Sequence, residues 1–234
     1  MSVAAIQKQL QGFSSREKAR LLQRFFKTGP GDYAEGDVFI GVVVPDIRRV
    51  AKAYQHFSLD EITVLLRSPI HEERLIALII LVLQFQKADE PARKAIFDFY
   101  LAHSRYVNNW DLVDLSAPHI VGAFLMDKEK GMLRALAKSH RLWERRIAIV
   151  STHYFIRHNR FSETLRIAKL LLNDEHDLIH KAVGWMLREV GKRNQEAEEK
   201  FLQQHYKRMP RTMLRYAIER FSRQKRHSYL HSLI

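Results

Sequence analysis

The sequence N-N-W-D-L-V-D-L-S-A at residues 108–117 has an acidic side chain where a helix would normally carry an apolar one. Read as a helix, it places four side chains on one face, at positions i, i+3, i+4 and i+7: Trp110, Val113, Asp114 and Ala117. A carboxylate therefore shares a stripe with an indole and two small apolar groups. A helix that served only for packing would carry leucine or isoleucine at position 114. The pattern indicates a functional site.

Pro118 directly follows this segment and sets its end. Proline has no N–H to donate to the carbonyl of Asp114, four residues earlier, so we predict that the helix kinks or ends there. An acidic group beside an aromatic ring and a helix break is typical of a site. A structural alternative, in which Asp114 forms an ion pair with an arginine, stays open at this stage.

Two further predicted helices carry groups of related chemistry. Trp185 lies on a largely charged face, so we expect its ring to be open to a ligand. Arg146 follows Trp143 by one helical turn, and we expect its aliphatic stem to run along an inner face. Trp143 itself is predicted to pack in the core, as most tryptophans do. The charged face around Trp185 comprises Lys181, Arg188, Glu189 and Lys192.

One carboxylate, two indoles and a guanidinium suit a cationic transition state next to a phosphodiester. A carboxylate such as Asp114 stabilises an oxocarbenium ion, as in the cleavage of glycosidic bonds. The faces of Trp110 and Trp185 attract cationic groups. The guanidinium of Arg146 binds phosphate with two parallel hydrogen bonds. The residue types therefore favour chemistry on a sugar–base bond of a nucleic acid.

Other constellations in the sequence are weaker. His176 and His180 have the spacing of two zinc ligands on a helix, but no third ligand is evident, and solvated histidines are the simpler interpretation. The basic run at residues 220–227 fits either a phosphate-contacting arm or a solvated tail. Neither a phosphate-binding glycine-rich loop nor a serine nucleophile elbow is present. We predict no metal and no cofactor.

Composition and charge limit the class of protein. The 234 residues include 46% hydrophobic ones, which makes disorder improbable, and the formal charge of +13 favours a polyanionic partner. Because cysteine is absent, disulfides, thiolate nucleophiles and cysteine zinc sites are excluded. The N-terminus lacks the pattern of a signal peptide, and the longest apolar run is too short for a bilayer. We expect a protein of the cytoplasm.

The pattern of apolar residues is helical along almost the whole chain. Ser14-Ser15-Arg16-Glu17 and Ser58-Leu59-Asp60-Glu61 both fit the capping box that starts a helix. Three glycines fall in one irregular loop over residues 28–37. We predict helices over residues 3–12, 15–27, 46–55, 59–67, 71–86, 90–103, 109–125, 128–139, 141–158, 162–173, 176–192, 195–208 and 211–222.

A weak repeat connects these helices. Ala77, Ala148 and Ala217 follow similar basic and apolar residues and lie roughly 70 residues apart, about twice the length of a two-helix unit. This spacing predicts an all-α solenoid of antiparallel, HEAT-like helix pairs in a single domain over residues 1–234. A basic residue that recurs at the start of these helices would line a concave groove with positive charge. The alternative is that these charges lie on the solvated outer face.

Three strings together resemble the AlkD-type DNA alkylation repair family of HEAT-like-repeat DNA glycosylases. They are N-N-W-D-L-V-D at 108–114, L-W-E-R-R-I-A at 142–148 and A-V-G-W-M-L-R-E-V-G at 182–191. The segment F-I-G-V-V-V-P-D-I-R-R at 39–49, which contains Arg48, is also similar to the family. The resemblance covers about residues 15–225.

The resemblance implies an enzyme that excises positively charged alkylated purines, 3-methyladenine and 7-methylguanine, from duplex DNA. Asp114 would support the oxocarbenium ion and the attacking water, and Trp110 and Trp185 would pack against the sugar-phosphate of the lesion. The bond would break without full extrusion of the base. A cationic base is already a good leaving group, so no general acid is needed. A monomer without cofactor is expected.

The resemblance also suggests which residues contact DNA. An arginine of the W-E-R-R string would hold phosphate; Arg146 is preferred, and the adjacent Arg145 stays open. Arg188, Lys181 and Arg48 complete the predicted contacts. The loop at 28–37 departs from the family pattern, and Phe26 and Tyr33 are both candidates for its N-terminal DNA-contacting aromatic residue. The rival interpretation is a non-catalytic protein that binds distorted or branched DNA.

Overall fold

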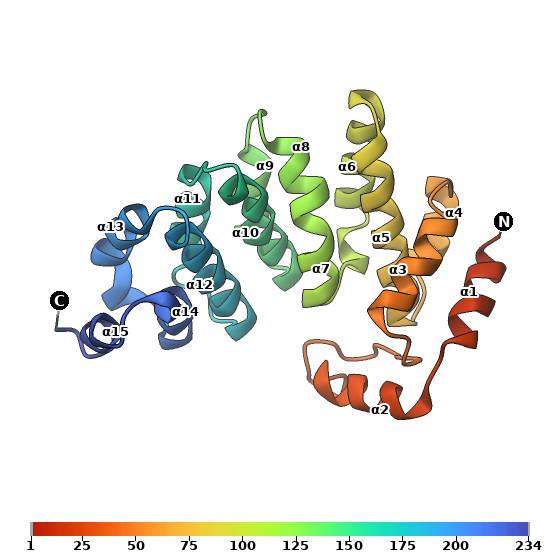
Figure 1. Ribbon diagram of the computed structural model, residues 1–234, viewed down its shortest axis with the longest axis horizontal. Helices are drawn as coiled ribbons and strands as arrows, with labels where there is room; N and C mark the ends of the chain where they lie inside the picture. Colours follow the sequence, from red (N-terminus) through yellow and green to blue (C-terminus); the bar gives the residue numbers. More distant parts are fainter. Residues whose placement is uncertain (1, 234) are drawn as a thin grey trace. The chain divides into compact units, whose positions relative to one another are not determined.

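The computed structural model describes residues 2–233 and contains helices joined by short loops (Figure 1). Within these residues no β-strand is present; the only β-type pairing is an isolated parallel bridge between Val38 and Ile70. The prediction of an all-α, helical-repeat protein is confirmed. The main loop lies where it was predicted, between the helices that end at Phe25 and start at Val44.

The chain forms two compact units, one up to Ser116 and one from Ala117. Each has its own buried core of aliphatic and aromatic side chains. The prediction of a single domain and the prediction of a concave basic groove both stay predictions.

The N-terminal unit is built around one long helix, α5 (His71–Lys87), in which every residue from His71 to Leu81 is buried. Helices α3 (Val44–Ala53) and α4 (Leu59–Leu66) pack against it. The buried residues of α5 include the charged side chains of its first turn, Glu72, Glu73 and Arg74. The other elements are α1 (Val3–Gly12), α2 (Arg16–Phe25), α6 (Glu90–Ala102), the 3-10 turn Ser104–Tyr106 and α7 (Trp110–Ala117).

The C-terminal unit is centred on α12 (Asp177–Gly191), which packs between α10 (Leu142–Arg157) and α14 (Arg211–Ala217). Gly184 allows the approach of α14, because a Cβ atom at this position would lie 2.4 Å from the carbonyl oxygen of Met213. The remaining elements are the turn Pro118–Gly122, α8 (Ala123–Leu125), α9 (Gly131–Leu136), α11 (Ser162–Leu170), α13 (Gln195–His205), two 3-10 turns (Tyr206–Arg208 and Ile218–Arg220) and α15 (Arg223–Leu230).

The repeat predicted from the sequence is visible in the burial of its small residues. Ala77, Ala148 and Ala217 are each completely buried in their helices. One basic residue of the repeat, Arg74, which precedes Ala77 by three positions, is buried and paired with Asp37, so it does not contribute to the predicted stripe. The apolar register of the repeat was therefore correct, and the inference from its basic residues was wrong at this helix.

Two predictions about helix starts have different outcomes. The capping box at Ser58 is present: its side chain accepts the N–H of Glu61, and the Glu61 carboxylate accepts the N–H of Ser58. The second capping box is absent, because Ser15 rather than Ser14 caps α2 and accepts the N–H of Lys18. The hydroxyl of Ser14 instead donates to Gln11 at the end of α1.

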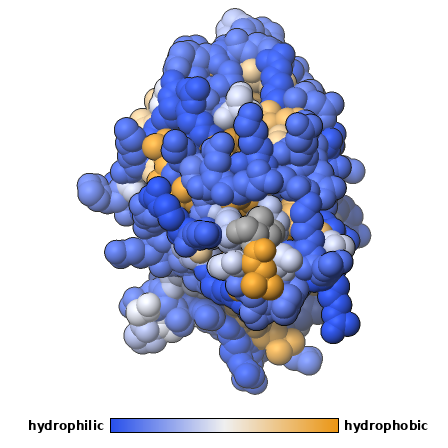
Figure 2. Space-filling view, turned by 90° about the vertical axis from the view of Figure 1, so that its left-hand side faces the viewer, coloured by the Kyte–Doolittle hydropathy of each residue, from blue (hydrophilic) through white to orange (hydrophobic). Residues whose placement is uncertain are grey.

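The basic run at residues 220–227 is neither a free arm nor a tail. Ser222 caps α15, and Tyr229 is buried and packs edge-to-face against Tyr206. Helix α15 was not predicted because charged residues dominate its sequence and it has few apolar side chains, among them the buried Tyr229. Its arginines Arg223 and Arg226 are exposed. The face of the molecule shown in Figure 2 is mostly hydrophilic, with smaller hydrophobic areas.

The helix break predicted at Pro118 is confirmed. Helix α7 ends at Ala117, and Pro118 begins a five-residue π-helical turn that ends at Gly122. A proline removes one hydrogen bond of the α-helical ladder, and the wider π-turn accommodates the loss. The break therefore follows Asp114 by one turn.

Candidate active site

Helix α7 presents Asp114 and Trp110 at the edge of the N-terminal unit's core. Val113 and Ala117, on the same face, are completely buried, whereas Trp110 and Asp114 are half-buried. The small residues fix the helix in the core, and the two larger groups extend beyond them. The predicted arrangement of this helix face is therefore present in the structure.

The buried hydroxyl of Tyr100 is close enough to Asp114 for the carboxylate charge to act on it. This hydroxyl and the Ser116 hydroxyl are 2.9 Å apart, and the Ser116 hydroxyl also donates to the carbonyl of Leu112. Burial raises the pKa of Tyr100, and the negative charge of Asp114 adds to the rise. The phenol therefore stays protonated and neutral.

Trp110 is held by a stack of aromatic rings. Phe26 lies parallel to the indole at 5.1 Å between ring centroids, and Phe39 stacks on the other side of Phe26 at 4.9 Å. Phe25 approaches the indole edge-on at 6.0 Å. Phe26 is buried, so of the two aromatic residues considered at the N-terminus it supports Trp110 from within the core. Tyr33 is half-buried in the loop.

Phe25 is the aromatic residue that sequence reasoning missed. Its side chain is 64% exposed, although it lies at the end of a helix and contacts two other rings. Its sequence signal was ambiguous because Phe25 and Phe26 are adjacent, and only the turn at the end of α2 decides which ring enters the core.

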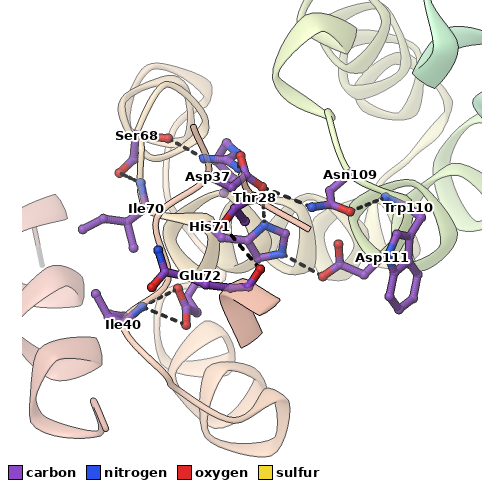
Figure 3. A network of polar contacts seen from close by, with 12 residues as sticks. Thr28, Asp37, Ile40, Ser68, Ile70, His71, Glu72, Asn109, Trp110 and Asp111 are labelled. Atoms are coloured by element: carbon purple, nitrogen blue, oxygen red, sulfur yellow. Dashed lines mark hydrogen bonds and ion pairs between the residues drawn. The ribbon is translucent and has the colours of Figure 1, made fainter. Parts of the chain in front are cut away.

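A buried polar network connects the 28–37 loop to the start of α7 (Figure 3). The ring of His71 lies between two carboxylates, with Nδ1 3.0 Å from Asp37 and Nε2 2.8 Å from Asp111. Asp37 also accepts hydrogen bonds from Arg74 at 2.5 Å and from the amide of Asn109 at 3.1 Å. The amide oxygen of Asn109 accepts the backbone N–H of the next residue, the first of α7. The network therefore fixes the helix start that carries Trp110.

The electrostatics of this network favour its charged form. Burial alone would lower the pKa of His71, but hydrogen bonds to Asp111 and Asp37 outweigh burial and raise it above 6.5. Burial alone would raise the pKa of Asp37, but the hydrogen bond from His71 and the charge of Arg74 lower it below 3.8. A protonated imidazole can donate one hydrogen bond to each of the two carboxylates.

Stability should therefore fall with rising pH through the titration of His71. A histidine whose folded-state pKa is raised contributes fully below its ordinary value of 6.5, and this contribution is lost as pH rises through the raised value. The free energy of unfolding, measured with urea, should therefore decline as the pH rises from 6.5 through the raised pKa of His71. The variant His71→Gln should be less stable by about 3 kcal/mol at the acidic end and should have a flatter profile. Parallel profiles for the two proteins would contradict the charged form of His71.

In the C-terminal unit, Trp185 occupies the charged face of α12. Its indole N–H donates to Glu189 at 3.2 Å, and its ring lies 5.6 Å from the ring of His153 on α10. Burial alone would raise the pKa of Glu189, but the hydrogen bond from Lys192 outweighs it and lowers the pKa. Trp185 is half-buried, and its accessibility to a ligand stays a prediction. Trp143 is also half-buried rather than part of the core proper.

The two arginines of the W-E-R-R string have different surroundings. Arg145 is paired with the buried Asp174, whose Oδ2 lies 2.6 Å from its Nε, and it also donates to the carbonyls of Ser139 and His140. Arg146 is buried, and its Nη1 donates to the carbonyl of Leu178 at 2.7 Å. Both side chains thus hold local structure around α10.

The other predicted DNA contacts differ in accessibility. Arg48 is exposed on α3. The side chain of Lys181 is 40% exposed, and its Nζ lies 2.7 Å from Oδ2 of Asp177. Arg188 is only 18% exposed and is paired with Glu219 and Glu189. Arg48 and Lys181 are therefore the more accessible cations of the predicted set.

His176 and His180 both take part in local hydrogen bonds. Nδ1 of His176 accepts the N–H of Leu178 as the cap of α12, and Nε2 of His180 lies 2.5 Å from the carbonyl oxygen of Asp174. Across residues 2–233, no group of three potential ligands is arranged to hold a metal ion. The spacing of the two histidines is explained by the start of α12.

The fold and this site define an all-helical repeat protein with a carboxylate and an indole at the edge of its core. The chain belongs to the DNA alkylation repair enzyme family, whose sequence pattern matches residues 6–221. A comparison with curated proteins finds no match. In the part of the chain that the structure describes, no helix is long and apolar enough to cross a membrane.

Three solved structures from two bacteria are among those of similar fold. A predicted DNA alkylation repair enzyme from Enterococcus faecalis has a TM-score of 0.70 at 17% identity, with 90% of this chain and 97% of that chain covered. AlkD2 from Streptococcus mutans has a TM-score of 0.54 at 19% identity, with coverage of 94% and 97%. The protein smu.31 from Streptococcus mutans UA159 has a TM-score of 0.52 at 18% identity, with coverage of 99% and 98%. At these identities the similarity establishes the fold.

Proposed function

We propose that the protein is a monofunctional DNA glycosylase that hydrolyses the N-glycosidic bond of positively charged alkylated purines in duplex DNA. The observation that carries this proposal is that Asp114 and Trp110 are both half-buried on one face of α7. The chain that carries them belongs to an alkylation repair family. We further propose that it acts as a monomer in the cytoplasm.

In the proposed reaction, Asp114 acts on the sugar. As the bond to the base breaks, positive charge develops on the deoxyribose, and a nearby carboxylate stabilises it and the water that attacks it. The indoles of Trp110 and Trp185 would contribute through their electron-rich faces. A cationic base departs as a neutral molecule and needs no acid.

DNA contact is proposed through phosphates. Among the cations named for it, Arg48 and Lys181 have the accessibility that this requires. Arg146 would contribute its positive charge from a buried position, where it donates to the carbonyl of Leu178, and Arg145 would act by holding Asp174 in place. Arg188, which is paired with Glu219, would contribute positive electrostatic potential without a direct phosphate contact.

Replacement of Arg48 by alanine should weaken DNA binding and lower its salt dependence. One phosphate contact contributes about one unit to the slope of log affinity against log salt, and we expect a loss of that size. Filter binding of one duplex at several salt concentrations measures this slope. Lys94→Ala removes an exposed cation that is paired with Asp98 on α6 and serves as the control. Equal slopes for Arg48→Ala and the parent would remove Arg48 from the contact set.

The proposal is tested by incubating the protein with methylated duplex DNA. Free 7-methylguanine and 3-methyladenine should accumulate in the supernatant, in proportion to protein and time. Binding of the DNA without release of either base would instead support the non-catalytic alternative.

A further inference from the structure

An open hollow with a basic lining is formed by helix α2 and the loop that follows it. Its volume is about 720 Å³, and three cations line it: Arg20, Arg24 and Lys27. The spacing i, i+3 and i+4 places Arg20, Gln23 and Arg24 on one face of α2, and Lys27 follows just beyond the helix end. Among the described residues that line the hollow, Asp32 is the single acidic one. The hollow therefore carries net positive charge.

The three cations of the hollow are exposed, and none of them forms an ion pair among residues 2–233. The acidic side chains of the adjoining loop bind their own backbone instead. Oδ2 of Asp32 accepts the N–H of Gly29 at 3.2 Å, and Oε2 of Glu35 accepts the N–H of Gly31 at 3.0 Å. Like charges gathered in one hollow create a positive potential that attracts anions. The hollow is therefore suited to an anionic group.

Lys27 has a backbone conformation that lysine rarely adopts. Its φ is 52°, in the left-handed region. The N–H of Lys27 donates to the carbonyl of Arg24 at 3.4 Å. The N–H of Thr28 donates to the carbonyl of Gln23 at 3.3 Å. These two bonds form the Schellman motif that ends many helices, and its left-handed position normally carries glycine or asparagine. Helix α10 has Asn159 there, with φ 58°.

The lysine at this position has a backbone cost that glycine would not have. Strained residues persist mainly where function requires them. A cation near the carboxyl end of a helix also interacts favourably with the helix dipole, but Arg24 already supplies one in the last turn of α2. The dipole therefore does not require Lys27, and the lining of the hollow gives its ammonium group a purpose.

The end of α2 also supports the candidate active site. Phe26, directly before Lys27, stacks on Trp110 at 5.1 Å between ring centroids, and Phe25 contacts the same indole edge-on. An anion bound in the hollow is thus held by the short segment whose aromatic rings position Trp110. Guanidinium groups bind phosphate with paired hydrogen bonds, and an ammonium group adds a point charge. Two arginines and a lysine therefore match a phosphodiester.

We infer that this hollow binds the phosphodiester backbone of the DNA, with Arg20, Arg24 and Lys27 as its contacts. The inference rests on the proposed function in that DNA is the partner. It adds three contacts to those proposed above, all of them on α2 and the residues that follow it. It also gives the loop at residues 28–37 a role, because Thr28, Gly29 and Asp32 complete the lining.

The first test measures the affinity of two Lys27 variants for one duplex by fluorescence anisotropy. Lys27→Gly and Lys27→Ala should each weaken binding by roughly fivefold, as for the loss of one exposed ion pair. The slope of log affinity against log salt should fall by about one unit. Lys8→Ala removes an exposed lysine of α1 that does not line the hollow, and it should bind like the parent. Parental affinity in both Lys27 variants would overturn the site.

Urea unfolding of the same variants separates a binding role from a structural one. Lys27→Gly should unfold at a higher urea concentration than the parent, because glycine adopts the left-handed conformation freely. Lys27→Ala keeps a Cβ atom and should show no such gain. A residue that loses affinity in both variants and gains stability in one serves the ligand. A lower urea midpoint for Lys27→Gly together with parental affinity would assign Lys27 to the helix end and overturn the inference.

A second test identifies the bound group as a phosphate. Single phosphates along each strand of the duplex are replaced in turn by neutral methylphosphonates. The parent should lose affinity at the contacted position, whereas Lys27→Gly should lose roughly nothing there, because the two changes remove the same interaction. Arg24→Gln should show the same loss of sensitivity at that position or at the adjacent phosphate. Identical patterns for the parent and both variants would overturn the phosphodiester contact.

Failure of the site and failure of the proposed function give different results. The release of 7-methylguanine by the parent protein is measured in the same preparation. Release by a protein whose Lys27 variants bind DNA like the parent removes the site and leaves the glycosylase in place. Binding that depends on Lys27 and Arg24, without release, keeps the site and removes the glycosylase.

Discussion

Asp114→Asn should reduce the rate of base release by roughly two to three orders of magnitude, because it removes one preorganised group that stabilises the developing charge. Asparagine has nearly the same size, so the packing of α7 around Val113 and Ala117 should persist. The loss should therefore appear in the single-turnover rate, whereas the affinity for DNA should change little.

The matched control for this variant is Asp98→Asn on α6, which removes an exposed carboxylate paired with Lys94. It should release bases at the parental rate. A rate for Asp114→Asn that equals the parental one would assign Asp114 to the structural ion pair considered at the outset.

The charge of the lesion should decide which damaged bases are released. 7-Methylguanine and 3-methyladenine carry a formal positive charge and leave as neutral molecules. Uracil, hypoxanthine and 1,N6-ethenoadenine are neutral and need a proton, which a general acid supplies with an effect of about a hundredfold or more. Because Asp114 is proposed to act as a carboxylate, we expect the neutral bases to be released at least about a hundredfold more slowly.

This comparison uses duplexes of one sequence that differ only in the damaged base, under single-turnover conditions. Equal rates for uracil and 7-methylguanine would contradict the mechanism, because they would require an acid near the base. Intermediate rates that follow the acidity of the leaving base would support it.

The helical fold was predictable because local patterns carry it. Apolar residues recur with the period of a helix, and small residues such as Ala77 and Gly184 mark where helices approach. The break at Pro118 follows from one missing N–H. The face of α7 that carries Trp110 and Asp114 follows from the same periodicity. These features depend on residues within a few positions of one another, which is why the sequence alone was sufficient.

The supports of the site could not be predicted in the same way. His71 contacts Asp37 and Asp111, which are 34 and 40 residues away in the sequence, and no local pattern predicts contacts over such separations. Arg74 was read as a surface charge because the repeat shows only its position, and burial depends on its distant partner. The choice between Phe25 and Phe26 depends on where α2 ends. Tertiary contacts decide each of these cases.

The most direct test of the account uses a duplex with a single 7-methylguanine and follows the mass of the damaged strand. We predict that the strand loses the mass of the base, gains the abasic site and stays unbroken, and that the free base appears in equal amount. This result requires the parental Asp114 and no added metal or cofactor. A strand that keeps its full mass in the presence of saturating protein, or that is cut at its phosphodiester, would contradict the assignment as a monofunctional glycosylase.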